Sequence, residues 1–134
     1  MTNPLTARWT TPFDLPPFAE IEDAHFAPAV EQTLAEGRDR IAQIATNPEP
    51  PTFANTIDAL ELAGDDLGRV LSVFFFQTSV DSTPTREALQ RDFSPLLSAY
   101  GSDIMLNADL FARIDALWQQ RDALDLTDEQ ARVL

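Results

Sequence analysis

Residues 52–78, TFANTIDALELAGDDLGRVLSVFFFQT, carry the pattern that decides the fold. Apolar residues recur there every three or four positions, which places them on one face of a helix. Thr52 is a suitable N-cap residue, and we expect the helix to end near Thr78. The residues on its core-facing side are Ile57, Leu60, Ala63, Leu67, Val70, Leu71 and Phe74.

The same predicted helix is apolar on a second side, formed by Leu62, Val73 and Phe76. A helix that is apolar on two sides must be covered on two sides. The cover is either the N-terminal segment or polypeptide outside this chain, and we predict that these three residues form an interface with a missing domain. Phe74 and Phe75 are predicted to lie in the core.

Three more amphipathic helices are predicted around this one. The first begins between Asp23 and Phe26, because Pro28 is tolerated only in the first turn, and it ends at Asn47–Pro48. Within this helix, Gly37 lies on the apolar face, where its missing side chain permits a neighbouring helix to approach closely.

The remaining two helices follow in the second half of the chain. Thr83–Pro84 is a capping residue followed by a proline at the first helical position, which begins one of them. Pro95 falls inside this helix and predicts a kink rather than a break. The other begins at Asn107 or Asp109, and Trp118 is predicted to face the core.

The two ends of the chain differ from this helical middle. Residues 1–22 are rich in proline, which disfavours helix, so we predict an extended arm anchored by the ring of Trp9. Residues 127–130, TDEQ, match the capping box that begins a helix. Because the sequence stops at Leu134 and so short a helix is marginal in water, we expect a truncated fifth helix and a longer parent polypeptide.

The predicted fold class is therefore all-α. We expect an antiparallel helical bundle of four main helices plus a truncated fifth, with an extended N-terminal arm. The predicted domain division is residues 1–22 for the arm and residues 23–134 for the helical domain.

Composition excludes several classes of partner. The chain has 22 acidic and nine basic residues, and its net charge of -13 repels nucleic acid and anionic membrane surfaces. It has no cysteine, so disulfides and thiolate chemistry are excluded. The N-terminus lacks the basic and apolar regions of a signal peptide, which predicts a soluble, cytoplasmic protein.

The titratable residues form no recognisable catalytic pattern, and we predict no catalytic, cofactor-binding or metal-binding residue. His25 is the only histidine, whereas catalytic zinc needs three protein ligands, so His25 is interpreted as a residue at a helix start. Glu20, Glu22 and Asp23 precede that helix and complement its dipole. Asp65–Asp66 is interpreted as part of a solvated helix face.

Several stretches together resemble one protein family. They are residues 13–18 (FDLPPF), 21–29 (IEDAHFAPA), 47–61 (NPEPPTFANTIDALE), 64–75 (GDDLGRVLSVFF) and 102–116 (SDIMLNADLFARIDA). They resemble the N-terminal region of the thimet-oligopeptidase-like zinc metallopeptidases. The last two stretches are more similar to the peptidyl-dipeptidase, or dipeptidyl carboxypeptidase, branch than to the oligopeptidase A branch.

The resemblance implies that residues 23–134 are the N-terminal helical domain of a larger enzyme. Such an enzyme binds zinc through a His-Glu-x-x-His motif and a later glutamate, none of which maps onto this chain. It hydrolyses short peptides and releases dipeptides from the carboxyl end, with the zinc-activated water as nucleophile. This chain would shape the substrate channel, with the remainder of the parent chain as its partner, and would have no activity alone.

A second hypothesis remains open. The chain could be a stand-alone acidic helical module for protein–protein interaction, with the Leu62, Val73 and Phe76 side as its docking surface. A gene that ends near Leu134 and a specific protein partner would distinguish this hypothesis from the peptidase.

Overall fold

The computed structural model describes residues 2–134, and helix is the only regular secondary structure in this part of the chain. The all-α prediction is confirmed. The helices are α1 (Phe26–Ala45), α2 (Ala59–Ala63), α3 (Asp65–Val80), α4 (Pro84–Met105), α5 (Ala108–Gln119) and α6 (Asp128–Val133). A π-helical turn, η4 (Phe53–Asp58), precedes α2, and short 3-10 turns lie at residues 12–14 (η1), 18–20 (η2), 23–25 (η3) and 121–123 (η5).

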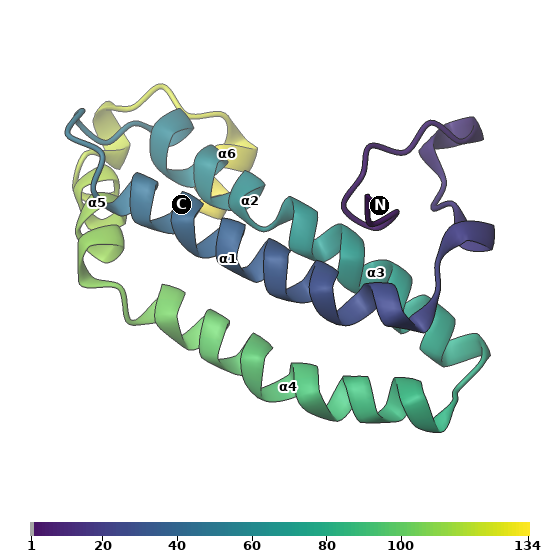
Figure 1. Cartoon of the computed structure of the whole chain (residues 1–134). Coiled ribbons are helices and arrows are strands. Elements are labelled where there is room, and N and C mark those ends of the chain that lie inside the picture. Colours follow the sequence, from purple (N-terminus) through teal and green to yellow (C-terminus); the bar gives the residue numbers. More distant parts are fainter. Residues whose placement is uncertain (1) are drawn as a thin grey trace.

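Helix α1 lies at the centre of the bundle and packs against α2, α3, α4 and α5. Figure 1 shows α3 running antiparallel to α1 on one side, while α4 returns along the other side in the same direction as α1. The long helices α1, α3 and α4 therefore alternate in direction, as predicted from the short connections.

The helix predicted over residues 52–78 is divided. Its start is confirmed, because Thr52 Oγ1 accepts a hydrogen bond from the Asn55 amide at 3.0 Å and Asn55 Oδ1 accepts one from the Thr52 amide at 2.8 Å. The single long helix is wrong, since Gly64 separates α2 from α3. Glycine favours helix poorly, and Asp65 and Asp66 stabilise the new helix start through its dipole.

The main core lies where α1, α3 and α4 meet. Phe74 is fully buried there, with its ring edge-on to Phe26 and to Phe93 at centroid distances of 5.0 Å each. Such edge-to-face pairs add about 0.5–1.5 kcal/mol each to the burial of the rings. A second, smaller cluster of Ile41, Ile44, Ala63 and Leu110 joins α1 to α2 and α5.

The close approach predicted at Gly37 is confirmed. A Cβ atom at this position would lie 2.6 Å from Tyr100 Oη, so a larger residue fits there only if the Tyr100 side chain or the helices shift. Tyr100 is buried, and this burial raises the pKa of its phenol above the ordinary value, against the opposing effect of Arg38 and Arg40. Helix α4 continues through Pro95 without a break, as expected.

The N-terminal arm is attached to the bundle at several points. Leu5 is completely buried in the main core, and Asn3 Nδ2 donates a hydrogen bond to His25 O at 2.8 Å. The Trp9 ring is held as predicted, since its Nε1 donates to Pro4 O and the Arg69 guanidinium lies 5.0 Å from the ring centroid.

Two aromatic residues predicted to be buried are on the surface instead. Phe75 is 43% exposed and Trp118 is 44% exposed. Phe75 follows Phe74 by one residue, about 100° around the helix, and so points away from α1. Trp118 is covered on one face by the guanidinium of Arg121, 4.3 Å from its ring centroid, which lets an aromatic ring remain at the surface.

Candidate interaction surface

The three residues of the predicted interface do not share one surface. Val73 is only 2% exposed and packs in the main core, so its side chain offers little to an external partner. Leu62 is 62% exposed and Phe76 is 54% exposed, but they line different hollows. Leu62 belongs to α2 and Phe76 to the far half of α3.

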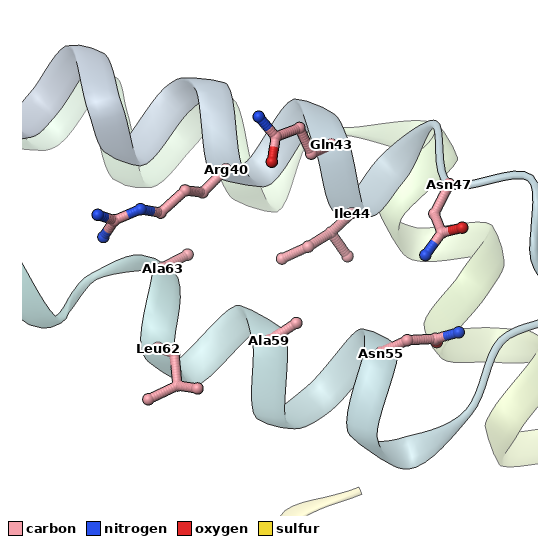
Figure 2. Close-up of a pocket in the computed structure, with 8 residues that line it drawn as sticks. All are labelled: Arg40, Gln43, Ile44, Asn47, Asn55, Ala59, Leu62 and Ala63. Atoms are coloured by element: carbon pink, nitrogen blue, oxygen red, sulfur yellow. The ribbon is translucent and has the colours of Figure 1, made fainter.

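Leu62 lies at the edge of a hollow of about 440 Å³ between α1 and the η4–α2 segment. Figure 2 shows Ile44 between the helices, with Ala59 and Ala63 facing α1, whereas Leu62 points away from α1. The small alanine side chains let the helices approach. Leu62 has no cover from α1 because its side chain points away from that helix.

The remaining lining of this hollow is polar, with Arg40, Gln43, Asn47 and Asn55 along its length. Arg40 Nη2 donates to Asp66 Oδ2 at 2.7 Å. This hydrogen bond is the main reason that the pKa of the Arg40 guanidinium is raised, and burial acts in the opposite direction. Arg40 therefore remains a cation and joins α1 to α3 through Asp66.

Phe76 lines a second hollow, of about 380 Å³, between the arm and α3. The Phe18 ring of the arm packs on Phe76 at a centroid distance of 5.6 Å, and Val73 and Trp9 lie in the same hollow. The arm thus provides part of the second cover that this side of the helix requires, and Phe76 stays more than half exposed.

A third hollow, of about 510 Å³, lies between η4–α2 and α6. We call it the acidic groove, and it is lined by Phe53, Ile57, Asp58, Glu61, Thr127, Glu129, Gln130 and Val133. Helix α6 begins with the predicted capping box, since Thr127 Oγ1 accepts from the Gln130 amide and Gln130 Oε1 from the Thr127 amide. Helix α6 has no buried residue, and its Val133 is 55% exposed.

Arg113 on α5 is a structural residue that the sequence analysis missed. It is only 8% exposed, and it donates hydrogen bonds to Asn47 O, Glu49 O and Asn55 Oδ1 at 2.8, 3.0 and 3.0 Å. It thereby holds the proline-rich loop that connects α1 to η4. Arg113 follows Leu110 by three residues and so lies on the same, apolar face of α5. This spacing could have indicated that Arg113 is buried.

The described residues do not fit a catalytic metal site. No group of three or more histidine, cysteine, aspartate or glutamate side chains in residues 2–134 is arranged to hold a metal ion. His25 lies at the start of α1, as predicted, and its Nδ1 accepts a hydrogen bond from the Glu22 amide at 2.9 Å. Within the same residues, no helix is long and apolar enough to cross a membrane.

The chain is similar to two dipeptidyl carboxypeptidases along almost its whole length. The dipeptidyl carboxypeptidase of Salmonella typhimurium is 42% identical over 133 residues, and that of Escherichia coli is 42% identical over 132 residues. These matches cover 99% and 98% of this chain. The chain is homologous to the dipeptidyl carboxypeptidases.

Oligopeptidase A of Escherichia coli is also related, at 38% identity over 103 residues, or 76% of the chain. The predicted order of the two branches is therefore confirmed. The chain spans only about a fifth of the length of the dipeptidyl carboxypeptidases, namely 20% and 19% of the two proteins. No protein-family model matches the chain.

Proposed function

We propose that this chain is the N-terminal helical domain of a zinc-dependent peptidyl-dipeptidase, in which it shapes one wall of the substrate channel. The observation that carries the proposal is the 42% identity along nearly the whole chain to proteins five times as long. The parent enzyme would act in the cytoplasm on short peptides and release dipeptides from their carboxyl ends.

In this proposal the chain supplies shape rather than chemistry. Its described residues do not fit a zinc site, so the metal and its ligands would belong to the remaining polypeptide. The metal would lower the pKa of a bound water and so supply the nucleophile for peptide hydrolysis. The exposed Leu62 and Phe76 would pack against the rest of the enzyme.

The test is to read the gene beyond Leu134 and to express the complete polypeptide. We expect a downstream His-Glu-x-x-His motif and the release of dipeptides from a peptide with a free carboxyl end, detected by mass spectrometry and abolished by a chelator. The 134-residue chain assayed alone is the control and should release nothing. A complete gene product without that motif would refute the peptidase and favour the interaction module.

A further inference from the structure

The acidic groove has an excess of negative charge that this chain does not neutralise. Asp58 and Glu61 line one wall, Glu129 lines the other, and all three are exposed. Within residues 2–134, none of these carboxylates forms an ion pair or a side-chain hydrogen bond. No arginine is among the residues that line the groove.

Within residues 2–134, all ion pairs of the arginines lie outside the groove, and Arg132 on α6, three residues after Glu129, forms none. Arg40 and Arg69 pair with Asp66, and Arg86 pairs with Asp23 and Asp81. The excess of 22 acidic over nine basic residues therefore remains uncompensated at places such as this groove. Carboxylates that face one another across a hollow repel, and a cation placed between them relieves that repulsion.

The groove also has apolar residues in its lining. Ile57 forms part of its lining, and Val133 is 55% exposed at its edge. Leu62 is exposed and follows Asp58 by four residues, so the outer face of η4–α2 presents an acid and a leucine together. A ligand that matches this face must offer both basic and apolar side chains.

We propose that the acidic groove binds a basic, amphipathic segment of the parent peptidase, from the polypeptide outside these 134 residues. This inference rests on the proposed function, because the relatives are about five times as long as the chain and so contain the polypeptide to supply such a segment. Arginine or lysine of the segment pairs with Asp58, Glu61 and Glu129, while its apolar side chains cover Val133 and Leu62.

The absence of cysteine from the chain permits a direct test of the occupant. Glu61→Cys places a thiol in the groove, and Asp92→Cys places one on α4, outside it. We expect a maleimide to label Glu61→Cys about tenfold more slowly in the complete polypeptide than in the 134-residue chain, because the segment must first leave the groove. Asp92→Cys should label at similar rates in both.

Equal labelling of Glu61→Cys in the two polypeptides would overturn the proposal, as would protection that requires an added peptide substrate. The labelling test and the peptidase assay can fail independently of each other. A complete polypeptide without peptidase activity, but with Glu61→Cys protected, would refute the enzyme and leave the groove occupied. An active enzyme with an unprotected thiol would refute the groove alone.

The charge requirement is tested with a synthetic amphipathic helix of leucine, alanine and arginine as the probe for the 134-residue chain. The groove variant is Asp58→Asn/Glu61→Gln/Glu129→Gln, and the matched control is Glu31→Gln/Asp39→Asn/Asp92→Asn, which removes equal charge. We expect the groove variant to bind the probe roughly tenfold more weakly and the control to change little. Equal weakening in both variants would reveal attraction to net charge only and would overturn the groove as a site.

Discussion

Replacing Arg113 by methionine removes the buried donor that joins α5 to the loop between α1 and η4. Asn47 O and Glu49 O would lose this donor, and Asn55 Oδ1 would keep only the Thr52 amide and the Thr56 hydroxyl, so we expect the free energy of unfolding to fall by about 2–3 kcal/mol. Urea unfolding followed by circular dichroism measures the change.

Arg38→Met is the control for this substitution. Arg38 and Asp103 form an exposed ion pair at 3.3 Å, and exposed pairs contribute less than about 1 kcal/mol. If the two variants were equally destabilised, the hydrogen bonds of Arg113 would not be the reason for its effect.

Gly37→Leu displaces the Tyr100 side chain or separates α1 from α4, because a Cβ atom alone would lie 2.6 Å from Tyr100 Oη. Overpacking of this kind costs about 1–3 kcal/mol, and the loss appears in the thermal midpoint. In contrast, Gly68→Ala on α3 has open space around its Cβ atom and should stabilise the chain by up to about 1 kcal/mol. A stable Gly37→Leu variant would show that the two helices are not closely packed here.

We predict that the folded chain loses stability at alkaline pH because of Tyr100. Its pKa is raised in the folded chain because burial disfavours the phenolate. The contribution of the neutral Tyr100 phenol to the free energy of unfolding is therefore complete below the ordinary tyrosine pKa of about 10. This contribution is lost as pH rises through the pKa of Tyr100 in the folded chain. Because Tyr100 is the only tyrosine, its ultraviolet absorbance follows this titration directly. Tyr100→Phe should remove the dependence, and an unchanged pH profile in that variant would contradict the assignment.

At the scale of the elements, helix starts were predictable and helix continuity was not. Thr52, Thr83, Asn107 and Thr127 all cap helices as the sequence indicated, because a cap depends on hydrogen bonds to the amide three residues later. The interruption at Gly64 lies within a continuous apolar pattern. The spacing of apolar residues does not show where the backbone hydrogen bonding of a helix changes.

Gly64→Ala tests this interruption. No atom lies within 4 Å of the position that its Cβ would occupy, so the substitution is free of steric cost. We expect α2 and α3 to join, with a gain of up to about 1 kcal/mol in the free energy of unfolding. Slower amide hydrogen exchange at residues 64–68 would report the joined helix, and faster exchange there would contradict it.

The candidate surface was only partly readable from sequence, because it depends on how the arm packs. Val73 and Phe76 are three residues apart and were assigned to one side, yet Val73 is in the core and Phe76 is half exposed. The arm covers Val73 and reaches Phe76 through Phe18, an arrangement that no local pattern encodes. The acidic groove was missed because it joins residues about 70 positions apart in the sequence.

For the molecule as a whole, exposed apolar residues predict self-association of the isolated chain. Leu62 and Phe76 are each more than half exposed, and burial of such side chains drives association. Sedimentation velocity should show concentration-dependent association that Leu62→Ser/Phe76→Ser reduces. Met105→Ser, at an 82% exposed position, is the control. A wild-type chain that stays monomeric at high concentration would contradict the prediction.

The central place of α1 also has a consequence for biosynthesis. The arm and α1 leave the ribosome before the helices that pack on α1, since residues 2–45 precede all of them. An isolated helix of this length is marginal in water, but α1 becomes buried progressively as α2, α3, α4 and α5 emerge. Each new helix finds its docking partner already synthesised, so assembly can proceed in the order of translation.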